Sequence, residues 1–214
     1  MNPSRIVQQI DSPRLVIFVQ GSWEIGDNPR NLAASQRITE AGLASTILYE
    51  SSRNWKALEN ASNQAEWIAA FGQKTYDNEL AELNDMIAYA KKEKGAKEIF
   101  LSGSSFGGGL AALVSASASR LLLAAPQIYC PPEKRVSIYQ GFPQAEQFFE
   151  AITKFSGKLR IIHGDRDETI STNQSAALYD QARTKDKRLV LLPGNHTFTD
   201  NIEGYVQEHL DFFR

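Results

Sequence analysis

The sequence predicts an α/β fold in which a mainly parallel central sheet of about six to seven strands carries helices on both faces. Two observations predict this class. Short apolar runs rich in β-branched residues recur between turn-forming residues, as expected of strands buried on both faces of a sheet. Stretches with helical spacing lie between these runs, and strands that alternate with helices form βαβ units. Because no repeat or linker interrupts this alternation, we expect one domain over residues 1–214.

The expected strands are spread along the whole chain. Six apolar runs are bounded by Gly, Pro, Asp or Ser, at residues 15–20, 44–49, 98–102, 121–125, 159–163 and 188–192. Residues 5–10 are expected to add one antiparallel strand at an edge. Together these runs account for the strands of the predicted sheet.

The clearest expected helix covers residues 75–95. Its apolar residues follow one another at spacings of 4, 3, 4 and 3 from Tyr76 to Ala90, which places them on one helical face. Thr75 is suited to cap its start and Gly95 its end. Further helices are expected at residues 29–41, 106–115, 144–155, 173–183 and 201–213. Segments 50–74 and 127–143 show no clear period, and both leave from the carboxyl ends of strands, where α/β folds build their sites.

The composition is that of an ordinary globular protein. Hydrophobic residues make up 42% and charged residues 22% of the 214 residues, far from the profile of a disordered chain. The formal net charge of −2 offers no basic field, so no nucleic-acid partner is expected. No stretch approaches the ~20 apolar residues of a membrane span, and the first 14 residues lack the apolar core of a signal peptide.

The chain has a single cysteine, Cys130, which cannot form an intrachain disulfide. This usage favours a cytoplasmic location. Cys130 lies in a Pro-rich loop with no helix start behind it to lower its pKa, so we expect a packed thiol rather than a nucleophile.

The pentapeptide Gly103-Ser104-Ser105-Phe106-Gly107 stands between an expected strand and an expected helix. This is the context of a G-x-S-x-G nucleophile elbow, in which the chain reverses so sharply that positions two before and two after the serine come close together. Glycine at 103 and 107 leaves room for that approach, whereas Ser104 has glycine on only one such side. We therefore predict Ser105 as the nucleophile, at a helix N-terminus whose dipole favours an oxyanion. The alternative is a Gly-rich turn that only connects strand and helix.

A serine nucleophile needs a base, and the chain has three histidines. His163 ends a strand before any plausible acid, while the expected order is serine, acid, histidine. His209 falls within the last helix, where a partly exposed structural histidine is expected. His196 lies in a loop directly after the last strand, so we predict it as the base.

The acid is expected in the turn after strand 159–163, where three carboxylates follow one another. We predict Asp167, because Ile170 beyond it can anchor that loop in the core. Asp165 and Glu168 are expected to be solvated or to pair with Arg166.

The alternation of His163, Asp165 and Asp167 also allows a metal site if the strand continues through them. Gly164 and the turn that follows argue against such a strand. We therefore expect neither a metal nor a cofactor.

A tetrahedral intermediate needs donors for its oxyanion. The amide of Phe106 is one candidate, and the second is expected in the loop after the first parallel strand, where Gly21 lets the chain turn. We favour the amide of Ser22, with Trp23 as the alternative. Trp23 is also expected to bind substrate; with Phe106, Trp55 and Trp67 it is a candidate for an apolar pocket wall, against the alternative of ordinary core packing.

These residues together resemble the α/β-hydrolase superfamily, and the small size resembles its dienelactone-hydrolase-like branch. The matching motifs are VQGS at 19–22, NPRN at 28–31, AGLA at 41–44, GSSFG at 103–107, HGDRD at 163–167 and GNH at 194–196. The resemblance covers nearly the whole chain and implies an α/β-hydrolase fold. No large lid domain is expected, because only about thirty residues separate the strand that ends at Ala125 from the one that begins at Leu159. It also implies a triad of Ser105, Asp167 and His196, with Phe106 and Ser22 as the oxyanion hole.

Two positions depart from that pattern. Gln20 stands where many members have histidine, which is expected to change hydrogen bonding around the site more than its chemistry. Ser105 stands where dienelactone hydrolase proper has cysteine, so that lactone substrate is not implied.

The expected function is therefore a cofactor-free serine hydrolase that acts on a small carboxylic ester or thioester. Two alternatives stay open at this stage: a ligand-binding protein of the same fold with slow or no turnover, and an acyltransferase that uses the same acyl-enzyme.

Overall fold

The computed structural model describes residues 4–22, 24, 28–51, 62, 63, 65, 66, 69 and 74–214. The expected pocket residues Trp23, Trp55 and Trp67 lie outside these residues, as does most of segment 50–74. Among the described helices, none combines the length and apolar character that a membrane span requires.

Within the described part of the chain, a seven-stranded sheet has the order β1-β3-β2-β4-β5-β6-β7. Its strands are β1 (Ser4–Gln8), β2 (Arg14–Val19), β3 (Ser45–Tyr49), β4 (Glu98–Ser104), β5 (Arg120–Ala124), β6 (Lys158–Gly164) and β7 (Lys187–Leu192). β1 runs antiparallel to β3, and every other neighbouring pair is parallel. The predicted mainly parallel sheet and its antiparallel edge strand are confirmed.

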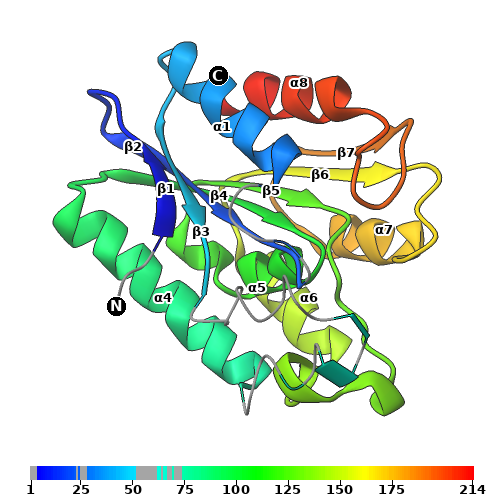
Figure 1. Cartoon of the computed structure of the whole chain (residues 1–214). Helices are drawn as coiled ribbons and strands as arrows, with labels where there is room; N and C mark the ends of the chain where they lie inside the picture. Colours follow the sequence, from blue (N-terminus) through cyan, green and yellow to red (C-terminus); the bar gives the residue numbers. More distant parts are fainter. Residues whose placement is uncertain are drawn as a thin grey trace.

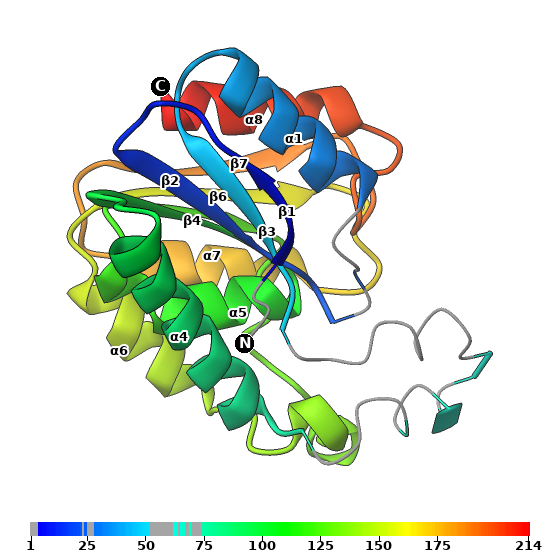
Figure 2. The same cartoon turned by 60° about the vertical axis from the view of Figure 1, so that its left-hand side comes forward.

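Helices cover both faces of this sheet (Figures 1 and 2). The helices that lie on one face are α1 (Pro29–Glu40) and α8 (Ile202–Phe213). Those on the other face are α4 (Tyr76–Glu93), α5 (Phe106–Leu113), α6 (Ala145–Lys154) and α7 (Thr172–Gln181). The predicted helices are confirmed with small shifts at their ends, and Thr75 caps α4 through a capping box with Asn78.

The central strands are apolar on both sides because each side packs against a helical layer. On β2, Val16 and Phe18 belong to the core that includes residues of α1 and α8, while Ile17 and Val19 belong to the core under α4 to α7. Side chains on a strand point alternately to the two faces, so a fully apolar strand fills two cores at once.

β7 departs from the prediction that its residues are buried on both faces. All of its residues are at least partly exposed, and 58% of the Leu191 surface is exposed. β7 is the edge strand next to β6, so the helical layers cover it less completely than they cover the central strands.

His209 is fully buried, so the expectation that this histidine is partly exposed is wrong, while its structural role is confirmed. Its Nδ1 lies 2.8 Å from the carbonyl oxygen of Tyr205, which can only accept a hydrogen bond, so Nδ1 carries the proton. Its Nε2 then accepts from Ser102 Oγ at 2.8 Å. Burial lowers the pKa of His209 to about 3, and the positive charges of Arg30 and Arg160 add to that shift.

This depressed pKa predicts a pH dependence of folding. Below about pH 6.5 the unfolded chain protonates His209, whereas the folded chain keeps it neutral until about pH 3. The free energy of unfolding should therefore fall with decreasing pH in this window, with His209 contributing up to about 1.4 kcal/mol per pH unit. Urea denaturation at several pH values should give a flatter dependence for His209→Gln. Ser102→Ala, which keeps the histidine, should retain the wild-type slope; equal slopes for wild type and His209→Gln would contradict the assignment.

Candidate active site

The chain reverses at Ser105, between the end of β4 and the start of α5. Ser105 has φ 52° and ψ −120°, a left-handed backbone conformation that non-glycine residues rarely adopt. Its N–H donates to the carbonyl oxygen of Ala124 in the neighbouring strand at 2.9 Å, which ties the strained residue to the sheet. Such conformations cost about 1–3 kcal/mol and persist where surrounding structure enforces them.

Two glycines make this reversal possible. A Cβ on Gly103 would lie 2.5 Å from the carbonyl oxygen of Gly107, so the predicted close approach of the two limbs is present. A Cβ on Gly107 would first overlap the carbonyl oxygens of Val19 and Gln20 at the end of β2. The sequence analysis expected glycine at 107 in order to clear the opposite limb of the turn. In the structure, glycine is needed there because the elbow packs directly on the neighbouring strand.

The structure brings together the three side chains that sequence analysis singled out. His196, in the loop after β7, places Nε2 3.0 Å from Ser105 Oγ. Its Nδ1 lies 2.7 Å from Asp167 Oδ2, in the turn after β6. The Asp167 side chain is fully buried, while 16% of the His196 side chain is exposed. A continuous path of hydrogen bonds therefore joins a buried carboxylate to a hydroxyl at the carboxyl edge of the sheet.

Asp167 is held by backbone donors as well. Its Oδ1 accepts from the N–H groups of Thr169 at 2.8 Å and Ile170 at 2.9 Å. Burial raises the pKa of this carboxyl, but hydrogen bonds from His163, His196 and the Ile170 amide outweigh it and leave the pKa lowered. Asp167 is therefore ionised at neutral pH. Ile170 is buried, which confirms its predicted role as the anchor of this loop.

His163 is a part of the site that sequence analysis missed. It is fully buried, and its Nε2 lies 3.0 Å from both Asp167 Oδ2 and the carbonyl oxygen of Ile170. Both oxygens can only accept, so Nε2 carries a proton, and Nδ1 forms a hydrogen bond with Ser175 Oγ at 2.7 Å. His163 thus donates to the same oxygen that faces His196. The sequence analysis excluded His163 as the base because it precedes the acid in the chain. The signal that the sequence offers for it is that His163 is a polar residue within an otherwise apolar strand.

Asp165 does not join His163 and Asp167 in a common cluster. Its Oδ1 accepts from the N–H of Gly194 at 3.0 Å and lies 3.7 Å from Arg166 Nε, so the predicted pairing with Arg166 is present. Within the described residues, no group of three or more His, Cys, Asp or Glu side chains is arranged to hold a metal ion.

The candidate oxyanion residues lie next to the serine. Phe106 is the first residue of α5, directly after Ser105, and Ser22 lines the same cavity as Ser105. Tyr139 donates its hydroxyl hydrogen to Ser22 Oγ at 2.9 Å. The ring of Phe106 is fully buried and packs edge-on against Tyr139 at 5.1 Å, so this side chain belongs to the core rather than to a pocket wall.

A cavity of about 780 Å³ opens onto Ser105 and His196. The irregular segment 127–143 contributes much of its wall, through Gln127, Tyr129, Cys130, Pro131, Lys134, Val136 and Tyr139. Cys130 is buried, and burial raises the pKa of its thiol, which fits the expected packed cysteine. Segment 127–143 therefore lines the cavity next to Ser105, at the edge of the sheet where the sequence predicts it.

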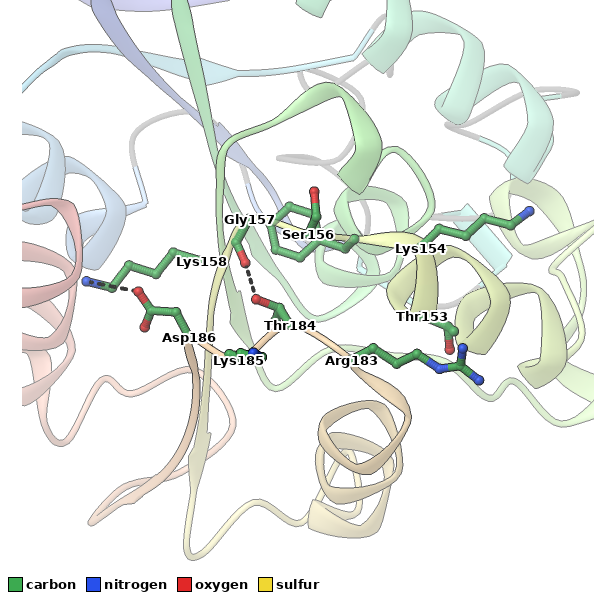
Figure 3. A pocket seen from close by; sticks show the side chains of 10 residues that line it. Thr153, Lys154, Ser156, Gly157, Lys158, Arg183, Thr184, Lys185 and Asp186 are labelled. Carbon is green, nitrogen blue, oxygen red and sulfur yellow. Dashed lines mark hydrogen bonds and ion pairs between the residues drawn. The ribbon is translucent and has the colours of Figure 1, made fainter.

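A second hollow, of about 580 Å³, lies at the amino ends of β6 and β7 (Figure 3). Its Thr184 donates to the carbonyl oxygen of Gly157 at 2.6 Å, and Lys158 lies 3.9 Å from Asp186. None of the residues that line this hollow is a histidine, and its hydroxyl groups therefore have no imidazole base beside them. The hydrogen-bonded side chains of Ser105, His196 and Asp167 lie at the other edge of the sheet.

The packing of the elbow predicts unequal costs for two glycine substitutions. A methyl group at Gly107 overlaps backbone atoms of β2, which cannot move without disturbing the sheet. At Gly42, with φ +67° and open space around it, alanine incurs only the left-handed backbone cost of about 1–2 kcal/mol. We expect Gly107→Ala to lower the free energy of unfolding by more than about 3 kcal/mol, measured by urea denaturation. Similar losses for the two variants would contradict this account.

Comparisons with known proteins identify the same fold. The solved structure of Est1E from Butyrivibrio proteoclasticus with bound ferulic acid has a TM-score of 0.73 at 18% identity, over 94% of this chain and 89% of that chain. A dienelactone hydrolase from Anabaena variabilis has a TM-score of 0.72 at 16% identity, over 97% and 88% of the two chains. A monoacylglycerol lipase from Paleococcus ferrophilus has a TM-score of 0.72 at 13% identity, over 99% and 100%. These likenesses establish the α/β-hydrolase fold.

No curated protein matches the sequence significantly. A family model described as serine hydrolase (FSH1) matches residues 8–201. This match spans most of the sheet and includes Ser105, Asp167 and His196. The chain therefore belongs to the FSH1 family of serine hydrolases.

Proposed function

We propose that this protein hydrolyses carboxylic esters or thioesters through an acyl-enzyme on Ser105. The observation that carries the proposal is the pair of hydrogen bonds at His196, 3.0 Å to Ser105 Oγ and 2.7 Å to Asp167 Oδ2. A serine hydroxyl is a weak nucleophile at neutral pH unless an adjacent base takes its proton. Membership of a serine hydrolase family supports the same reaction class, as do structural neighbours named as lipolytic enzymes and as a lipase.

The ionised Asp167 sets the tautomer of His196. A carboxylate can only accept a hydrogen bond, so Nδ1 of His196 carries the proton and Nε2 presents its lone pair to Ser105. This is the form that a general base needs. Because the pKa of Asp167 is lowered, its carboxylate remains an acceptor for His196 throughout the neutral pH range.

In the first half of the reaction, Ser105 Oγ attacks the carbonyl carbon of the substrate while its proton moves to His196 Nε2. The amides of Phe106 and Ser22 donate to the resulting oxyanion, and removal of one such donor typically costs about 2.7–4 kcal/mol of barrier. The bond to the leaving alcohol or thiol then breaks, and His196 returns its proton to that group. In the second half, water attacks the acyl-enzyme by the same route and releases the acid. Every group required comes from the chain itself, the substrate and water.

The cavity supports a small acyl substrate. Its volume of about 780 Å³ lies within the ordinary range of small-molecule sites. Tyr129, Pro131 and Val136 supply apolar surface, whereas Gln127 and Gln174 supply amide groups. The wall therefore combines apolar contacts with a few polar groups that can orient an acyl group.

The direct test is a panel of nitrophenyl esters and acyl-CoA thioesters of increasing chain length. Ser105→Ala should lower turnover at least about 10⁴-fold, because it removes the attacking atom. Ser104→Ala makes the same chemical change one residue earlier and should retain turnover within about tenfold. A fluorophosphonate probe should label the wild type and the Ser104→Ala protein but not Ser105→Ala. A Ser105→Ala protein with full turnover would refute the proposal.

The hydrogen bond from His163 to Asp167 should affect the pH dependence of kcat/KM. His163→Leu removes one donor from Asp167, so the carboxylate directs more negative charge toward His196 and stabilises its protonated form. We expect the acidic limb of kcat/KM to move to higher pH by up to about one unit. His163→Gln, which retains an N–H donor, should keep the limb closer to its wild-type position. A folded His163→Leu protein with an unshifted limb would contradict this role.

A further inference from the structure

The loop after β2 contains a buried carboxylate that touches two parts of the site. Glu24 Oε2 accepts from the N–H of Gly21 at 2.7 Å and from Ser104 Oγ at 2.8 Å. Gly21 immediately precedes Ser22, the candidate oxyanion residue, and Ser104 immediately precedes Ser105. One oxygen atom therefore joins the loop that contains Gly21 and Ser22, the oxyanion loop, to the nucleophile elbow at Ser105.

The other carboxylate oxygen of Glu24 forms an ion pair with Arg30 Nη2, from the first turn of α1. Only 10% of the Glu24 side chain and 3% of the Arg30 side chain are exposed. Arg30 Nη1 donates to the carbonyl oxygen of Thr197, the residue after His196. The guanidinium also lies over the ring of Tyr205, with Cζ 5.3 Å from the ring centroid. The ion pair thus extends the connection to the loop after β7 that contains His196, the histidine loop.

We infer that Glu24 and Arg30 are positioning residues that hold the oxyanion loop, the nucleophile elbow and the histidine loop in register for catalysis; the inference rests on the function proposed above. The three segments follow β2, β4 and β7; β2 and β4 are neighbours in the sheet, whereas β7 is its edge strand. The Glu24–Arg30 pair contacts all three.

The energetics of a buried ion pair favour a geometric role. Removing two charges from water costs about as much as their attraction returns, so such a pair contributes little net stability compared with apolar side chains. Its hydrogen bonds are nevertheless directional and hold their partners in one arrangement. Arg30 has a second effect, because it neutralises a carboxylate that would otherwise stand unopposed near the developing oxyanion.

The chain contains a matched pair away from the site. Arg160 and Glu208 form a similar ion pair, with side chains 11% and 16% exposed, and Arg160 Cζ lies 5.4 Å from the ring centroid of Phe212. This pair joins β6 to α8, and its hydrogen bond lies outside the three site loops. Arg160→Met therefore reproduces the loss of a buried guanidinium without disturbing the proposed catalytic groups.

The experiment measures kcat, KM and Tm for wild type, Arg30→Met, Glu24→Gln, the double variant and Arg160→Met, with active sites counted by fluorophosphonate labelling. Arg30→Met should lower kcat per active site at least about tenfold and keep KM within about threefold of the wild-type value. The reason is that the three loops, once displaced, carry groups that act in the transition state. The double variant should recover part of that loss, since it removes the unopposed carboxylate. Arg160→Met should lower Tm and leave kcat per active site near the wild-type value.

Ser104→Ala provides a milder variant that removes one hydrogen bond and no charge, and we expect kcat to fall about threefold. Active wild-type enzyme whose Arg30→Met, Glu24→Gln and Ser104→Ala variants keep kcat within about twofold would overturn the positioning role and leave the esterase proposal intact. Inactive wild-type protein, or full turnover by Ser105→Ala, would overturn the esterase proposal and this inference with it.

Discussion

The backbone reversal at Ser105 is the constraint on which the rest of the structure depends. A left-handed serine between a strand and a helix is strained, and it persists because neighbouring backbone encloses it. Gly103 faces the carbonyl of Gly107, and Gly107 lies against the end of β2, so the elbow requires β2 and β4 to be direct neighbours. The elbow therefore depends on this strand order, and the hydroxyl lies at the carboxyl edge, where the loops after β6 and β7 begin.

The charge distribution around that hydroxyl follows from burial. A fully buried carboxylate is unfavourable unless several donors satisfy it, and Asp167 receives donors from two imidazoles and two backbone amides. His163 donates from Nε2, and both of its ring nitrogens are occupied by buried partners. This leaves His196, the more exposed ring, as the group free to exchange a proton with Ser105. The two histidines differ in role because their surroundings differ.

A polar network behind the site connects the end of β2 to α1 and α8. Gln20, which stands where many resembling proteins have histidine, is fully buried and accepts from Asn31 Nδ2 at 2.8 Å. Asn31 in turn accepts from the hydroxyl of Tyr205 at 2.6 Å. Gln20 thus links the end of β2 to α1, and this network lies beside the ion pair of Arg30, which packs on the same tyrosine.

Sequence alone determined the alternation of strands and helices, the elbow and the candidate residues Ser105, Asp167 and His196. Periodicity, glycine positions and the order of residue types along the chain can be recognised without knowing how the chain folds. Tertiary structure decided the exposure of β7, the burial of His209, the contact of His163 with Asp167 and the bridge from Glu24 to Arg30. Each of these depends on which element covers another and on how close two side chains come after folding. A residue's type states which bonds it is able to make, and only packing selects the partner.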